Sequence, residues 1–248
     1  MSRVSRGFRI TGWVIKSLFY VLVFSVIAFL LWRIGSSGNP KSMKTITPNE
    51  KLCAAYERTQ GDMEMFRQEQ NILTRGEDNA GYFAVTECLF IPDANQIQIV
   101  VRYNNSTIRA TAEDYSLESV PSRDAELYDV SLTVATDLTP NVTEDNAGND
   151  PESVAFTRVF PSSVSADTKN LYNYRRLVFD LDEVGLSLGE LVSTDLLLAV
   201  YADIYYNGDI RYDEPAYGTL CLYDYVTERE PASLERRDRK AIEAYREP

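Results

Sequence analysis

The chain of 248 residues contains no histidine and only three cysteines. Histidine is the commonest general base and the commonest zinc ligand, so its absence excludes Ser-His and Cys-His nucleophile pairs. Three cysteines are too few for a disulfide framework and allow at most one pair. No motif indicates a specific catalytic function, and we therefore predict a protein that is not an enzyme and has no cofactor and no metal site.

Acidic residues are absent from the first 49 positions, and the first one is Glu50. Seven basic residues precede it, so with a whole-chain net charge of −12 the residues from Glu50 onward carry −19. A surface this acidic repels phosphate backbones. We therefore predict that the globular part binds no nucleic acid. Apolar residues make up 44% of the chain, which is typical of a folded protein.

A long apolar run lies near the N-terminus, between Trp13 and Trp32. A helix of that length spans about 30 Å, which matches the hydrocarbon core of a bilayer. The two tryptophans sit at its ends, where indole rings prefer the membrane interface. We predict a short basic cytoplasmic tail at 1–12 and a transmembrane helix at 13–33, whose partner is the lipid bilayer.

A cleaved signal peptide is the rival interpretation, because 35–38 offers the small residues Gly, Ser, Ser and Gly for cleavage. The length of the apolar run, and Arg33 between it and those residues, favour a retained anchor. A short basic tail before the run and a long domain after it predict a single-pass protein of the cell (plasma) membrane. Its N-terminus is expected in the cytoplasm and its domain outside, although the charge bias across the segment is small.

Two segments are predicted between the membrane helix and the domain. Gly, Ser, Pro and Lys dominate 34–46, which indicates a linker. Thr47 to Glu50 is typical of a helix start, with Thr47 as the cap, and predicts a juxtamembrane helix at 47–75. Its heptad-like seam either packs on the protein's own domain or forms a homodimer through 47–73. The seam consists of Leu52, Tyr56, Thr59, Met63, Phe66, Gln70 and Leu73.

From position 80 the apolar pattern changes to that of strands, and 80–226 is predicted to be an antiparallel β-sandwich in a mainly β protein. The arrangement is similar in architecture to immunoglobulin-like sandwiches, but it lacks their Cys…Trp…Cys signature and implies no function. A charged, solvated helical tail is expected at 227–248. The predicted strands are Tyr82–Ile91, Gln96–Tyr103, Leu127–Ala135, Val154–Phe160, Arg176–Leu181, Leu196–Tyr206 and Thr219–Tyr225.

The dipeptide Asn207-Gly208 between two strand patterns predicts a two-residue type I′ hairpin, with Tyr206 opposite Asp209. Neither face stays apolar to the tip, so we expect the hairpin to project and display its tyrosines to a basic protein or a polyhydroxylated ligand. Half-buried strand tyrosines are the simpler alternative. The predicted partner-binding residues are Tyr201, Tyr205, Tyr206, Asp209, Tyr212 and Asp213.

Two acidic groups suggest other chemistry. Asp180 and Asp182 lie two apart on a predicted strand, so they share a face as the carboxylates of a glycoside hydrolase would, although exposed strand-end residues are the simpler interpretation. A second group around the hairpin has oxygen ligands that suit calcium but no EF-hand spacing, and a solvated acidic tip is simpler. This second group is Asp203, Asp209, Asp213 and Glu214.

Cys88 and Cys221 both fall in predicted strands. They either form a disulfide between sheets or remain as two buried thiols, since cysteine is a good core residue. Cys53 is then the cysteine left without a disulfide partner.

These observations together predict a membrane-tethered, acidic β-sandwich that acts as a binding or assembly module without catalysis. Two other functions remain open: an envelope spacer that dimerises through 47–73, and a histidine-free hydrolase that uses Asp180 and Asp182. The sequence identifies no partner or pathway.

Overall fold

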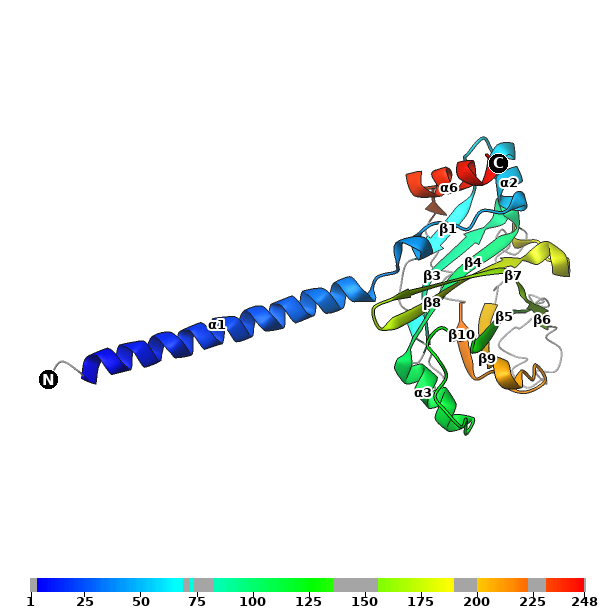
Figure 1. Ribbon diagram of the computed structural model, residues 1–248. Helices are drawn as coiled ribbons and strands as arrows, with labels where there is room; N and C mark the ends of the chain where they lie inside the picture. Colours follow the sequence, from blue (N-terminus) through cyan, green and yellow to red (C-terminus); the bar gives the residue numbers. More distant parts are fainter. Residues whose placement is uncertain are drawn as a thin grey trace, which may run out of the picture. The chain divides into compact units, whose positions relative to one another are not determined.

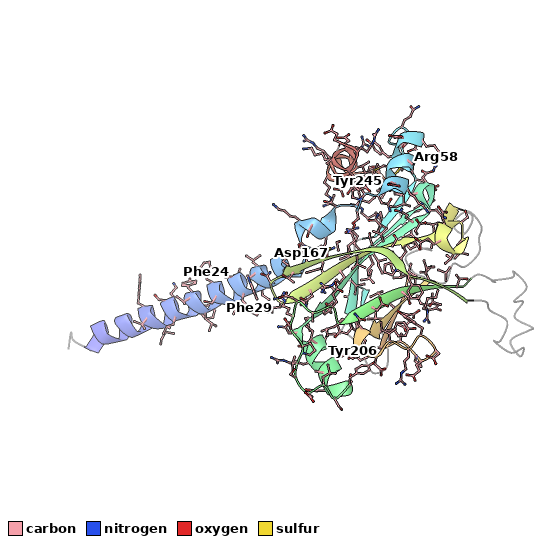
Figure 2. All side chains as sticks on the ribbon, turned by 45° about the vertical axis from the view of Figure 1, so that its right-hand side comes forward. Phe24, Phe29, Arg58, Asp167, Tyr206 and Tyr245 are labelled. Atoms are coloured by element: carbon pink, nitrogen blue, oxygen red, sulfur yellow. The ribbon has the colours of Figure 1, made fainter. Side chains whose placement is uncertain are left out.

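The computed structural model describes residues 4–68, 72–73, 83–135, 156–189, 200–222 and 231–247, in two compact units that meet between Asn39 and Pro40. The first unit is the helix α1, Val4–Ser37 (Figure 1). Its stretch Trp13–Trp32 has a mean hydropathy of 2.5, and its large apolar side chains, Phe24 and Phe29 among them, are exposed (Figure 2). The helix is long and apolar enough to cross a membrane, and an N-terminal signal sequence would share these properties.

The second unit contains two antiparallel sheets (Figure 1). The larger sheet has the order β11-β1-β3-β4-β8-β7, with β2 paired to β3, and the smaller has the order β10-β9-β5-β6. The strands of the larger sheet are β1 (Met65–Gln68), β2 (Ile72–Leu73), β3 (Phe83–Ile91), β4 (Gln96–Asn104), β7 (Pro161–Lys169), β8 (Tyr172–Asp180) and β11 (Pro231–Ala232). Those of the smaller sheet are β5 (Tyr128–Ala135), β6 (Phe156–Val159), β9 (Val200–Tyr206) and β10 (Gly218–Cys221).

The main apolar core lies between the two sheets. Alternate residues of β4, from Ile97 to Tyr103, pack in one cluster with Val130 and Leu132 of β5 and Ile204 of β9. This confirms the predicted alternation and the two antiparallel sheets. The immunoglobulin-like topology is not confirmed.

The second face of the larger sheet is covered by helical segments, so the fold is mixed α/β rather than mainly β (Figure 1). The covering segments are the 3₁₀ helix η1 (Lys41–Lys44), α2 (Glu50–Arg58) and α6 (Arg236–Arg246). Because both faces are covered, all nine residues of β3 are buried.

The predicted linker at 34–46 is wrong at both ends. The helix α1 continues to Ser37, and the chain from Pro40 belongs to the folded domain. Met43 packs with Val100 and Tyr174 on the larger sheet, and Ile46 enters the cluster beneath α2 and α6; each is only 1% exposed. Because Gly, Ser and Lys dominate this segment, its composition did not reveal that two of its apolar residues are buried in the domain.

The predicted helix at 47–75 is also wrong beyond its first turns. Asn49, not Thr47, caps α2, because its Oδ1 accepts the Leu52 N–H at 2.9 Å. The helix ends at Arg58, and a turn with positive φ at Gln60 and Gly61 leads into strand β1. The predicted heptad spacing arose because buried residues of a short helix are followed, at similar intervals, by buried residues of the turn and the strand. Met63 and Phe66 are buried in the domain, which removes the continuous seam on which a dimer through 47–73 depended.

The C-terminal helix is confirmed as α6, but it is not a solvated tail. Leu234 and Ile242 are buried with residues of α2 and the larger sheet. One helix was not predicted: α3, Asn105–Asp114, begins directly after β4 with a capping box between Asn104 and Thr107.

Candidate functional site

The segment after β9 does not form the predicted two-residue hairpin. Asn207–Asp209 form a 3₁₀ turn (η6), and β9 pairs instead with β10, with Gly218 opposite Ile204. The Asn207 N–H donates to the carbonyl of Leu127 at 2.8 Å, so the Asn-Gly pair is used to dock on the neighbouring strand. The connection 207–217 is called the acidic loop below.

The predicted faces of β9 are confirmed, but the tyrosines do not project. Ile204 faces the core, whereas Tyr205 lies on the outer face of the smaller sheet and is only 5% exposed. The Tyr212 ring folds back against it with a centroid distance of 4.9 Å, and the Arg158 guanidinium lies 5.2 Å from Tyr205 and 4.9 Å from Tyr212. The Tyr212 hydroxyl donates to Asp129, and burial together with this bond raises the pKa of Tyr212 to about 12.

Tyr206 belongs to a different group, at the end of the sandwich near α3. Its ring stacks on Tyr115 at 4.5 Å with an interplanar angle of 34°, and Figure 2 labels its position. Further ring contacts join the Tyr115 ring to Tyr217 and the Tyr217 ring to Phe83 and Tyr128. Apart from the many tyrosines, nothing in the sequence indicates this cluster, because its members come from five separate segments.

The exposed acids of the loop are partly neutralised within it. Arg211 pairs with Asp209 at 3.2 Å and with Glu214 at 3.0 Å. Asp213 is exposed. Tyr201 is half-buried on the outer face.

Asp203 stands apart from the acids of the loop. Its carboxylate accepts hydrogen bonds from Thr133 and Thr219, and burial raises its pKa. The four carboxylates of the calcium hypothesis therefore do not converge. Within the described residues, no group of three or more acidic or cysteine side chains is placed to hold a metal.

A cavity of about 120 Å³ lies between the two sheets, at the base of the acidic loop. Ile204 and Asn207 line it from the β9 side, and Tyr103, Tyr128 and Phe83 supply aromatic faces. The charged groups at its rim are Glu126, Asp129 and Arg175, whose guanidinium lies 5.8 Å from the Tyr103 ring centroid. Aromatic walls with a few charged groups are typical of sites that hold one small group or side chain.

Asp180 and Asp182 do lie close together, but Lys51 occupies the space between them. Its Nζ is 2.6 Å from Asp180 Oδ2 and 2.8 Å from Asp182 Oδ2. The hydrogen bond from Lys51, followed by that from Asn95, lowers the pKa of Asp182. A glycosidase needs one carboxyl with a raised pKa, so this geometry favours an ion pair that fastens α2 to β8.

A second group of charged side chains is buried on the helix-covered face of the larger sheet. Arg176 Nη2 bonds Glu87 Oε2 at 3.0 Å, and both side chains are 1% exposed. The Gln98 amide pairs with both backbone groups of Thr47 at 2.9 Å and also accepts from Arg176. Burial lowers the pKa of Arg176, with Glu87 opposing the shift.

The same face holds a second buried ion pair, between Arg67 of β1 and Asp238 of α6, at 2.8 Å. Asp238 Oδ1 also accepts the Ile46 N–H at 3.0 Å. Arg67 reaches Glu235 as well, at 3.0 Å. The two groups together, called the buried ionic network below, join the segment after α1, the larger sheet and α6. Sequence reasoning missed them because each residue resembles a solvated strand or helix position.

Cys53 and Cys88 carry free, buried thiols, which for Cys88 favours the buried-thiol interpretation over a disulfide. The side chain of Cys221 lies outside the described residues.

No protein-family model matches the sequence, and no curated protein or solved structure is significantly similar to it.

Proposed function

We propose that this chain is a single-pass membrane protein whose extracytoplasmic domain binds a partner at the acidic loop and the adjoining cavity, without catalysis. One observation carries the proposal: the predicted recognition segment and the cavity are continuous. Ile204 and Asn207 belong to both, and Asp129 lines the cavity while it fixes Tyr212 of the loop.

The loop is held in one conformation by bonds to the sheet beneath it. Asn207 is anchored on Leu127, Tyr212 on Asp129 and Arg158, and the Tyr217 hydroxyl donates to Asp114 at 3.1 Å. A loop that is ordered before binding loses little conformational entropy when a partner docks. This favours recognition over the passive spacer, whose dimerising helix does not extend past Arg58.

The chemistry of the surface fits a basic protein segment. Asp209, Asp213 and Glu214 are exposed on a domain whose net charge is strongly negative. Opposite charge speeds encounter and selects the partner. A single Lys or Arg side chain is small enough for the cavity, where it would lie between aromatic faces and the carboxylates of Glu126 and Asp129.

A crosslinking pull-down of the full chain from membranes tests this proposal. The variant Asp209→Lys/Asp213→Lys is expected to lose the partner. The matched control is Glu243→Lys/Glu247→Lys, which makes the same charge change at exposed positions at the end of α6. Recovery of only monomeric bait under several crosslinkers, or equal loss with both double variants, would count against the proposal.

The membrane part of the proposal rests on α1 and has its own test. Only Gly38 and Asn39 separate α1 from the folded domain, so a retained anchor would tether it closely. A retained anchor predicts a full-length N-terminus in the membrane fraction after alkaline extraction. A soluble product that begins near residue 38 would establish the signal peptide instead.

A further inference from the structure

Strand β7 forms an open edge of the larger sheet. Eight of its nine residues pair with β8, from Pro161 opposite Phe179 to Lys169 opposite Tyr172, with a bulge at Ser162. Among the described strands β8 is its only neighbour. Within the described residues the other strands with a single neighbour are shorter: β6 and β10 have four residues each, and β11 and β2 have two. A long unpaired edge is a template for a further strand.

Pro161 and the bulge at Ser162 protect the start of β7, but from Ser163 to Ala166 the strand lacks the features that usually protect an edge. Residues 162–166 are Ser, Ser, Val, Ser and Ala, all exposed. Charged side chains, which discourage strand addition, occur only at Asp167 and Lys169. Outside α1, three of the five exposed large apolar side chains in the described residues are on β7 or beside its ends: Phe160, Val164 and Leu171.

We propose that this edge pairs with β7 of a second copy of the same chain, antiparallel about a two-fold axis at Ser165. In this register Val164 lies opposite Ala166 of the second copy. Phe160 at one end comes opposite Asn170 of the second copy, one position from Leu171, so exposed apolar side chains gather along the interface.

The charge distribution selects the antiparallel arrangement. Asp167 would face Ser163 of the second copy, and Lys169 would face Pro161, so each charged half meets a neutral half. Parallel pairing in register would place Asp167 against Asp167 and Lys169 against Lys169, which is unfavourable. A self-complementary patch about a two-fold axis is the commonest form of homodimer interface.

The cavity gives a second reason for a second copy. Val164 lines the cavity from the β7 side, and its side chain is 54% exposed. In the proposed dimer Ala166 of the second copy packs beside Val164, so the second copy completes that wall. The dimer does not depend on what the cavity binds, because its contacts are those of β7 itself.

Cysteine crosslinking of the full chain in detergent micelles tests the register. Ser165→Cys places two thiols at the two-fold axis, close enough for a disulfide. Ser163→Cys lies on the same face, two residues from the axis. In the proposed register the thiols that it introduces in the two chains would be four positions apart along the paired strands. We expect an intermolecular disulfide for Ser165→Cys and none for Ser163→Cys or the parent chain. Equal crosslinking of both variants would overturn the register.

A charge substitution tests the interface itself. Val164→Lys places two like charges beside the axis and is expected to raise the dimer dissociation constant at least tenfold. Val120→Lys is the matched control, because Val120 is a valine of similar exposure, 57% against 54%, in another part of the chain. Sedimentation of both variants measures the change, and the thermal midpoint verifies folding. A parent chain that stays monomeric, or equal weakening by both substitutions, would overturn the proposal.

Discussion

The two faces of the larger sheet are buried by different means. The face toward the smaller sheet is covered by apolar side chains, such as Ile99 against Leu132 and Ile204. The face toward the helices combines two apolar clusters with the buried ionic network, in which Arg176, Glu87 and Asp238 are all at most 1% exposed. Both faces bury apolar side chains, but only the helix-covered face also buries charged groups almost completely; Arg175, on the other face, borders the cavity.

The difference reflects what each face has to hold. Two regular sheets present extended apolar surfaces, and such packing tolerates exchange of one hydrophobic residue for another. The helical face has to fix irregular segments from opposite ends of the chain. Hydrogen bonds to Thr47 and Ile46 specify where that backbone lies, which apolar contact alone does not. The following predictions test this division.

The largest effect is expected for Arg176→Met. This substitution removes the closer of the two cations around buried Glu87 and leaves only Arg67, whose Nε is 3.9 Å from Glu87 Oε1; breaking a buried ion pair costs about 3–5 kcal/mol of unfolding free energy. The double variant Glu87→Leu/Arg176→Met should regain most of the loss, because neither charge is then stranded. Denaturant titration measures both. A double variant as unstable as the single one would show that the pair acts through its shape rather than its charge.

On the other face, Ile99→Ala should destabilise the domain by about 2–5 kcal/mol through the lost transfer energy and the cavity it leaves. Proteolysis should still find α6 docked in the folded fraction, since Ile99 does not belong to the cluster beneath that helix. Selective release of α6 would contradict the independence of the two faces.

A smaller and local effect is expected for Asp238→Asn. The bond to the Ile46 N–H survives, but the ion pair with Arg67 is lost, at a cost of about 1–3 kcal/mol. Hydrogen exchange should increase in α6 and near Ile46 before it increases in β4. Glu243→Gln, at an exposed position of the same helix, is the matched control and should change neither.

The smallest effect is expected for Lys51→Met, because this ion pair is open to solvent. Asp182 has a lowered pKa, so its stabilisation exists above the unfolded value of about 3.9 and is lost as the pH falls through the folded pKa. Lys51 has a raised pKa, so its share is lost only as the pH rises through that folded value. The variant should lose less than about 1 kcal/mol at pH 7 and nothing measurable at pH 2. A loss that persists in acid would contradict the ionic origin.

The apolar patterns were sufficient to predict much of the fold. Alternation identified β4 and β5, whereas β3 and β9 were recognised as short apolar runs bounded by Pro, Asn, Asp or Gly. Strand β7 was not predicted, because its sequence, PSSVSADTK, has almost no apolar pattern. It forms a strand because it pairs with β8. The juxtamembrane helix was predicted to be too long because Met63 and Phe66 continue a helical spacing of apolar residues across a turn.

The position of the turn in the candidate site could be predicted, but its conformation could not. The Asn-Gly signal correctly marked a turn after Tyr206, yet local preference could not reveal the bond from Asn207 to Leu127 that replaces the hairpin. Tyr205 and Tyr206 were grouped because they are adjacent, although strand geometry sends them to opposite faces. The cavity was not predicted, because it depends on how the two sheets approach each other.

The bond between Ile46 and Asp238 joins residues 192 positions apart, and this separation has a consequence for biosynthesis. At 5–20 residues per second, about 10–40 s pass on the ribosome between the appearance of the two partners. Throughout that interval the Ile46 N–H lacks its acceptor, although Thr47 already has its partner Gln98, so the segment after α1 makes this contact only once α6 has been synthesised. Maturation of this protein therefore ends close to where its synthesis began.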